Sequence, residues 1–145
     1  MIRFADIGGR YINPSKVISV QDKARGDGCI VEFGGAGDII ERGNPYRLRR
    51  QTIELYASVS NVIKDFQLNS SINFIKLKAA RGRDDSNSRR IYINPNRVTS
   101  LHARGRGTRN ETVVDVQFEN GSSVLVSDDL DRLLLLLQVA SSPDR

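Results

Sequence analysis

Arginine side chains are the groups in this sequence whose number and spacing point most directly to chemistry. The 145 residues include 17 arginines but only five lysines, and the formal net charge is +5. Guanidinium groups are favoured over ammonium groups where phosphate or carboxylate is held by two parallel hydrogen bonds. Residues 81–109 contain eight arginines and two aspartates, so this segment carries +6 and the rest of the chain −1. We interpret the segment as an anion-binding region.

Two connections hold most of these arginines, one at residues 79–90 and the other at 102–110. Gly82, Gly105 and Gly107 allow main-chain N–H groups to approach an anion closely, while the arginines supply charge and paired donors. No Gly-Lys-Ser or Gly-Lys-Thr sequence follows, so the stretches do not match a P-loop. We expect a phosphate cradle of another kind.

The sequence offers little for catalysis. It has one cysteine, Cys29, and one histidine, His102, whereas zinc sites and Cys–His or Ser–His catalysis draw on several such residues. Adjacent carboxylates such as Asp84 and Asp85 point in different directions, which suits solvation better than a shared metal. We therefore predict that the protein is not an enzyme and uses no cofactor and no metal. His102 is either a ligand contact or a plain surface residue.

No membrane segment or export signal is evident in the sequence. The purest apolar run, residues 133–137, consists of five leucines, whereas a membrane helix needs about 20 apolar residues. Near the start of the chain, Asp6 and a pair of glycines stand where a secretory signal has an apolar stretch. We expect a cytoplasmic protein that does not bind a membrane.

The chain contains an internal duplication. Residues 11–20 align without gaps on residues 92–101, with six identities in ten positions. An alternating strand follows each copy, and in these strands Val31 and Phe33 correspond to Val116 and Phe118. The matching strand-like runs are 1–7 and 72–78 before the aligned stretches, and 29–33 and 113–118 after them. We predict an α+β fold in which duplicated antiparallel β-meander units, residues 1–66 and 72–140, are each closed by one helix within a single compact domain.

Each unit is predicted to end in a helix. Asn44-Pro45 is typical of a cap followed by a first-turn proline, and apolar residues recur at helical spacing over residues 53–66. The second helix is expected to start at Ser127, where two following aspartates suit the positive end of the helix dipole. Five consecutive leucines point in all directions around this helix. We therefore expect a second surface to cover it: the other unit, another subunit, or a crevice beside the first helix.

Pro14 and Pro95 repeat one feature of the two units. Proline cannot donate to a strand ladder, so each marks an edge position or a bend. Consecutive hairpin loops of a meander lie at opposite ends of the sheet, so the two arginine connections meet only if the strand through residues 92–101 bends at Pro95 or if subunits pack end to end. Unprotected strand edges favour pairing between protomers, and we predict a homo-oligomer.

Three functional classes fit these features. The first is a non-catalytic binder of a small phosphorylated molecule such as a nucleotide. The second is a DNA- or RNA-binding regulator, which the sequence pI of ≈ 9.7 suits, although no basic recognition helix or aromatic stacking platform is evident. The third is an assembly protein whose arginines pair with acidic partners.

Two families share parts of this pattern. The order of strand, Tyr-Ile-Asn-Pro-x-x-Val, strand, Asn-Gly turn, strand and short helix over residues 72–139 resembles the short flagellar FlbD-like proteins, from which the long arginine loops depart. Over the whole chain, the length, the duplicated β-rich layout, the two helices and the arginine-rich loops resemble the first Thoeris anti-defence family of phages. This second resemblance implies a sponge, an oligomer that holds cyclic ADP-ribose-type immune signals, or in some members cyclic oligonucleotides, without degrading them.

Under this interpretation, the second arginine connection makes the main contacts to the ligand. Arg104, Arg106 and Arg109 are expected to bind phosphate, and Asn110 or Thr108 to bind ribose hydroxyls. The remaining candidates are Arg81, Arg83, Arg89 and Arg90 from the neighbouring connection, Arg25 as the first-unit counterpart of Arg104, and Phe74 and Tyr92 for stacking on a base, with burial in the sheet as the alternative for both rings.

Overall fold

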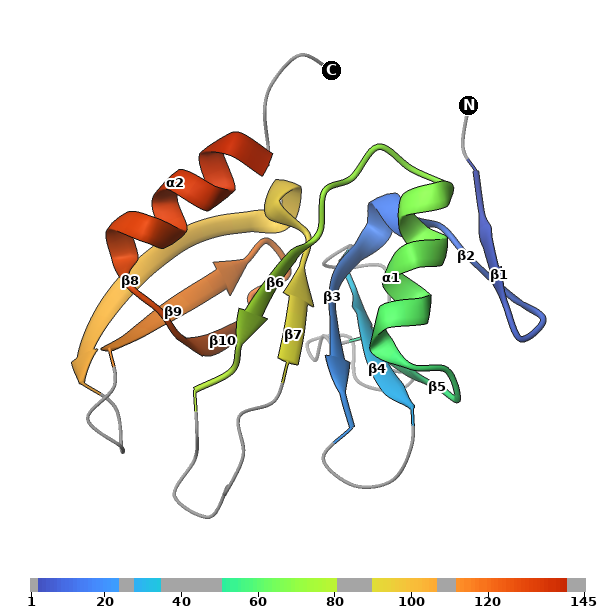
Figure 1. Cartoon of the computed structure of the whole chain (residues 1–145), viewed down its shortest axis with the longest axis horizontal. Helices are drawn as coiled ribbons and strands as arrows, with labels where there is room; N and C mark the ends of the chain where they lie inside the picture. The colour runs from blue at the N-terminus through green and yellow to red at the C-terminus, as the bar shows by residue number, and fades with distance from the viewer. Residues whose placement is uncertain (1–2, 24–27, 35–50, 81–89, 107–111, 141–145) are drawn as a thin grey trace, which may run out of the picture.

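The computed structural model describes residues 3–23, 28–34, 51–80, 90–106 and 112–140 (Figure 1). Two helices and antiparallel strands account for these residues, which confirms the predicted α+β fold. The elements, in chain order, are β1 (Ala5–Ile7), β2 (Arg10–Ile12), the 3-10 turn η1 (Pro14–Lys16), β3 (Val17–Asp22), β4 (Cys29–Phe33), β5 (Gln51–Leu55), α1 (Val59–Leu68), β6 (Ile75–Lys78), β7 (Arg90–Ile93), the 3-10 turn η2 (Pro95–Arg97), β8 (Val98–Arg106), β9 (Thr112–Phe118), β10 (Ser123–Ser127) and α2 (Leu130–Ala140).

The strands form three antiparallel sheets within these ranges. The largest has the order β5-β4-β3-β7-β6, the second β10-β9-β8, and β1 and β2 form a separate hairpin. The end of β6 also meets β10, because Ala79 bridges Val126 and the Ala80 N–H donates to the Leu125 carbonyl over 2.8 Å. In Figure 1, α1 lies beside β3 and the β1–β2 hairpin, and α2 lies over the β8–β10 sheet. Each helix therefore covers the strands of its own unit.

The two units repeat the same register as well as the same sequence. Val31 is paired with Val20 and Ile53, and Val116 is paired with Leu101 and Val124. The first pairs of the central hairpins also correspond, Val17 with Phe33 and Val98 with Phe118, and an irregularity follows each of them. β1 to β5 with α1 are thus counterparts of β6 to β10 with α2.

The first helix starts later than the sequence predicted. Residues 51–55 form β5, which pairs with β4, and α1 begins at Val59 with Ser58 as its N-cap. The Ser58 hydroxyl accepts a hydrogen bond from the Asn61 N–H over 3.2 Å. The expected start at Asn44-Pro45 lies outside the described residues. The helix prediction was wrong over 51–55, because strand pairing with β4 overrides the helical spacing of its apolar residues.

The second helix begins within a few residues of the predicted start. Its cap is Asp129, whose carboxylate accepts a hydrogen bond from the Arg132 N–H over 3.2 Å. Leu133 and Leu137 are buried against the strands, whereas Leu134, Leu135 and Val139 are exposed. Neither the first helix nor a crevice covers these exposed side chains in the described part of the chain. No helix in the described ranges is long and apolar enough to cross a membrane.

Each unit has its own apolar core, and the two cores exchange residues. Ile18 of β3 belongs to the core of the second unit, while Ile72 and Phe74, which precede β6, belong to the core of the first. The apolar interior of the chain therefore consists of two interlocked clusters. This exchange holds the units together by apolar burial, which stabilises them by roughly 25 cal/mol for each Å² removed from water.

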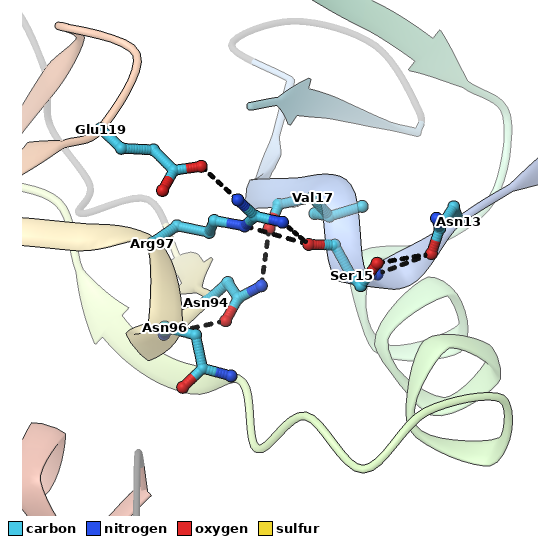
Figure 2. A network of polar contacts seen from close by, with 7 residues as sticks. All are labelled: Asn13, Ser15, Val17, Asn94, Asn96, Arg97 and Glu119. Carbon is cyan, nitrogen blue, oxygen red and sulfur yellow. Dashed lines mark hydrogen bonds and ion pairs between the residues drawn. The ribbon is translucent and has the colours of Figure 1, made fainter. Parts of the chain in front are cut away.

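The two Asn-Pro sequences form equivalent bends, as one of the sequence alternatives predicted. The Asn13 side chain accepts a hydrogen bond from the Ser15 N–H over 3.1 Å, and the Asn94 side chain accepts one from the Asn96 N–H over 3.0 Å. Figure 2 shows that the bends also meet each other. The Asn94 amide donates to the Val17 carbonyl over 2.9 Å. The β3–β7 pairing and these contacts fix the relative placement of the units.

Candidate anion-binding site

The bend at Pro95 divides the predicted strand over residues 92–101 into β7 and β8, which run in opposite directions (Figure 1). As a result, the strand ends that flank residues 81–89 and those that flank residues 107–111 lie along one long side of the molecule, at the bottom of the view. The ends of β3 and β4 that flank residues 24–27 lie there too. We call this side, whose described cations include Lys23, Lys78, Arg90 and Arg104, the arginine edge.

Arg90 is held at the arginine edge by a carboxylate of the neighbouring unit. The antiparallel pairing of β3 with β7 places Gln21 opposite Ile91, so the end of β3 lies next to the start of β7. The Arg90 Nε atom donates to Asp22 Oδ2 over 3.2 Å, and the Arg90 side chain is 45% exposed. This pair ties the base of the 81–89 connection to the base of the 24–27 connection.

Arg104 is more weakly held. Its Nε atom lies 3.9 Å from Asp115 Oδ2, and its side chain is 57% exposed. This distance is too long for a hydrogen bond. Asp115 is buried opposite His102, and its Oδ1 atom has no hydrogen-bond partner in the described part of the chain. The carboxylate orients Arg104 without engaging its donors fully, so these donors remain accessible to an anion.

Lys23 and Tyr56 form a pair that the sequence analysis missed. The Lys23 Nζ atom lies 3.6 Å from Glu54 Oε2 and 5.7 Å from the centre of the Tyr56 ring. The ring is 91% exposed and directly follows β5. Tyr56 falls within residues 53–66, for which the apolar spacing predicts a helix. In the structure residues 51–55 form β5 instead, so Tyr56 lies at the end of a strand. Its exposed ring is a surface on which a base can stack.

The two rings proposed for base stacking are placed differently. Phe74 is 8% exposed and packs against Phe66 in the first core, with ring centroids 5.8 Å apart. A ring packed in this way has no face for a base, which removes Phe74 from the site. Tyr92 is half-buried and packs against the same core. Burial in the sheet, the alternative given for both rings, describes Tyr92 in β7, whereas Phe74 is buried against α1 just before β6.

Several predicted ligand residues fall outside the described residues. For Arg106 the structure gives the strand position at the end of β8 and no more. The others outside it are Arg25, Arg81, Arg83, Arg89, Thr108, Arg109 and Asn110. The described part of the site therefore consists of the strand ends that carry Arg90 and Arg104. The seven residues just named belong to the connections between these strand ends.

Cys29 is fully buried at the start of β4. Burial, and then the negative charge of Asp22, raise the pKa of its thiol to about 11. A thiol with this pKa is protonated near neutral pH and is a poor nucleophile. Within the described ranges, no cluster of three or more His, Cys, Asp or Glu residues is arranged to hold a metal ion.

The described part of the arginine edge thus offers exposed guanidinium groups and a cation beside an exposed ring, and its buried thiol, Cys29, is protonated near neutral pH. This combination suits the binding of a phosphorylated ligand. Comparison with known proteins found no family model, no curated protein and no solved structure that matches this chain.

Proposed function

We propose that this protein binds a small cyclic nucleotide, of the cyclic ADP-ribose or cyclic oligonucleotide type, at the arginine edge and sequesters it unchanged. In this proposal it acts as a homo-oligomer in the bacterial cytoplasm, where removal of the signal counters an immune system. The observation that carries the proposal is the shared location of three connections. The strand ends that flank residues 24–27, 81–89 and 107–111 all lie along the same long side of the molecule, with Arg90 and Arg104 exposed beside them.

The charge distribution supports a compact anion. Arg90 and Arg104 each lie beside a carboxylate from outside the segment 81–109, and Arg97 pairs with Glu119. The segment itself carries +6, and an excess of +3 remains when these three carboxylates are counted. Phosphate oxygens accept charge-assisted hydrogen bonds, each roughly twice as strong as a neutral one. A diphosphate brings several acceptors into one small volume, so a few arginines from neighbouring connections satisfy it together.

The exposed ring of Tyr56 supports a ligand that carries a base. Stacking of a base on an aromatic side chain is worth about 1–3 kcal/mol. The Lys23 ammonium beside this ring adds a positive charge that suits a phosphate attached to the same ligand. Tyr56 thus takes the role that the sequence analysis gave to Phe74 and Tyr92.

Sequestration without turnover suits the types of group at this edge. A guanidinium group stays protonated at neutral pH and has no acceptor atom, so it binds phosphate but does not act as a general base. Cys29 is buried, and its raised pKa keeps the thiol protonated. Sequestration requires tight binding and no catalytic group, and guanidinium groups supply that binding.

Calorimetric titration with cyclic ADP-ribose tests the proposal. Arg104→Ala and Arg109→Ala should each weaken binding at least tenfold, because each removes a charge-assisted contact of about 1.5–3 kcal/mol. Arg3→Ala is the matched control: Arg3 is exposed before β1, away from the arginine edge, and its loss should change affinity less than twofold. Unaltered binding by Arg104→Ala and Arg109→Ala would contradict the proposed site.

The same titration with a short DNA duplex distinguishes the cyclic-nucleotide proposal from the alternative of a DNA- or RNA-binding regulator. Binding to a polyanion grows with its length and falls steeply with salt, because counterions are released. A cyclic nucleotide bound at a fixed number per protomer favours the proposal. Tight duplex binding with that salt dependence, and none to the nucleotide, would overturn it.

A further inference from the structure

Two of the unpaired strand edges in the described structure, those of β8 and β2, belong to the counterparts of the two strands that join the units. β3 of the first unit pairs with β7 of the second, with Ser19, Val20 and Gln21 opposite Ile93, Tyr92 and Ile91. By the repeat, β8 is the counterpart of β3, and β2 is the counterpart of β7. Among the described strands, β8 pairs with β9 alone and β2 with β1 alone. We call the β3–β7 pairing and the contacts around it the joint between the units. Each chain thus has both unpaired strands, β8 and β2, that a second joint of this kind needs.

Exposed apolar side chains lie at the same two places. Ala5 pairs with Ile12 as Ile75 pairs with Ile93, so Phe4 is the counterpart of Phe74. Phe74 is 8% exposed because it packs on α1, whereas Phe4 is 52% exposed. Phe4 therefore lacks the helix surface that its counterpart has.

The helix α2 has an exposed apolar residue where α1 has a buried one. Its cap Asp129 corresponds to Ser58, so Leu134 is the counterpart of Ile63. Ile63 of α1 is 5% exposed in the first core, whereas Leu134 is 41% exposed. α2 therefore lacks the aromatic cover that Phe74 and its neighbours give to α1.

Two hollows lie beside the unpaired strands, at places whose counterparts at the joint between the units are filled by side chains. One, of about 360 Å³, lies beside β2 and is lined by Tyr11, Asn13, Phe33 and Gly34 among others. At the corresponding place in the second unit, Ile18 of β3 is packed in a core with Ile93 and Phe118. The other hollow, also about 360 Å³, lies between β8 and α2, with Leu101 and Leu134 in its lining.

We propose that copies of this chain associate head to tail by repeating the joint between the units. β8 and α2 of one copy receive the β1–β2 hairpin of the next copy. β8 pairs antiparallel with that β2, in the register Ser100 with Ile12, Leu101 with Tyr11 and His102 with Arg10. Phe4 of the next copy packs on α2 at Leu134, as Phe74 packs on α1.

This interface joins two different surfaces, so it is heterologous and produces a ring or a filament rather than a two-fold dimer. It is also weaker than the joint within the chain. Arg97 and Glu119 form an ion pair at the internal joint, and their counterparts are Lys16 and Gly34, which cannot form one. Assembly is therefore expected to be reversible and to depend on concentration.

The inference extends the homo-oligomer of the proposed function and rests on no property of the ligand. Its test is therefore made without nucleotide, by size-exclusion chromatography with light scattering. The wild-type chain should form species larger than a dimer at about 100 µM, a concentration at which a joint with Kd of about 10 µM is mostly formed. Phe4→Asp and Leu134→Asp should each be monomeric, with unchanged circular dichroism, because both side chains are exposed in the single chain.

Mixing the two variants distinguishes this interface from any symmetric one. Phe4→Asp retains its β8–α2 surface, and Leu134→Asp retains its hairpin surface, so an equimolar mixture should give a 1:1 heterodimer and nothing larger. The matched control is Val139→Asp on the same helix. Its counterpart Leu68 stays 67% exposed in the covered first unit, so Val139→Asp should assemble as wild type does.

Three results would overturn the proposal: a monomeric wild-type chain at this concentration, a Phe4→Asp variant that still assembles, or a mixture that remains monomeric. None of these results bears on ligand binding, which calorimetry with the monomeric variants measures separately. Failure of the assembly proposal and failure of the nucleotide proposal are therefore distinguishable.

Discussion

Arg97 donates through its Nε atom to the main-chain carbonyl oxygen of Ser15, which lies 3.0 Å away, although 82 positions separate the two residues in sequence. Arg97 follows the second Asn-Pro bend and Ser15 lies in the first, so one side chain connects the two copies of the duplicated motif (Figure 2). The same guanidinium also pairs with Glu119. Arginine at this position thus serves the joint between the units rather than a ligand.

Replacement of Arg97 should destabilise the fold. Arg97→Ala removes charge-assisted hydrogen bonds at a half-buried position, and we expect the free energy of unfolding to fall by about 1–3 kcal/mol. Arg97→Lys should recover only part of this loss, because an ammonium group does not reproduce the planar fork. Urea denaturation measures both effects.

The control for this prediction is Arg90→Ala. Arg90 also pairs across the units, with Asp22, but its side chain is 45% exposed. Exposed ion pairs contribute at most about 1 kcal/mol, so the Arg90 variant should lose less stability than the Arg97 variant. Equal losses would show that the Arg97–Ser15 contact has no special role in joining the units.

Two glycines with positive φ should respond differently to alanine. Gly28 has a φ of +107°, and a Cβ atom there would lie 2.2 Å from the Leu55 carbonyl oxygen. Gly121 has a φ of +88° with nothing within 4 Å. Backbone strain alone costs on the order of 1–3 kcal/mol, so we expect that loss for Gly121→Ala and a larger one for Gly28→Ala. Thermal melting of both variants gives the comparison, and a smaller loss for Gly28→Ala would contradict the β4–β5 packing described above.

Stability should fall at alkaline pH because of Cys29. Its pKa is raised from 9.0 to about 11 in the folded chain, so between these values the unfolded state loses a proton that the folded state keeps. The sign of this linkage favours unfolding as pH rises. We expect a loss of roughly 1–3 kcal/mol between pH 9 and pH 11, from about 1.4 kcal/mol for each pK unit.

Comparison with Cys29→Ala isolates this contribution from lysine and tyrosine titration. The variant should be less stable than wild type at pH 8, because a buried side chain is truncated, and the difference should shrink as pH rises towards 11. A difference that stays constant over this range would show that the thiol does not titrate with the shifted pKa.

Much of the fold could be predicted from the duplication. Six identities over residues 11–20 and 92–101 predict two equivalent bends, and Asn13 and Asn94 do cap equivalent 3-10 turns. The correspondence of Val31 with Val116 also holds in the strand register. These features are local, so the sequence determines them without knowledge of the packing.

The sequence analysis missed β5 because the connection that precedes it is much longer than the corresponding connection in the second unit. In the first unit 17 residues separate β4 from β5, whereas in the second a short Asn-Gly turn joins β9 to β10. In both units the central strand position, Ile53 or Val124, precedes the helix cap by five residues. Aligning the units backwards from the caps, rather than reading helical spacing alone, would have identified β5.

The sequence left the shared location of the arginine connections open, because that location depends on whether the strand bends at Pro95 or has it at an edge position. An unbroken strand over residues 92–101 would place the two connections at opposite ends of the sheet. The η2 turn divides it, so β7 and β8 run in opposite directions. The pairing of Arg90 with Asp22 depends on the β3–β7 pair, which spans the units, and the exposure of Tyr56 depends on the β4–β5 pair within the first unit.

The most direct test of the central claim is native mass spectrometry of the purified protein with a panel of cyclic nucleotides, followed by chemical analysis of the ligand after heat release. Sequestration at the arginine edge predicts one cyclic nucleotide bound at a fixed number per protomer, loss of this complex in Arg109→Ala at unchanged melting temperature, and recovery of the ligand intact. A released ligand that has been cleaved, or the same retention by wild type and Arg109→Ala, would contradict the account.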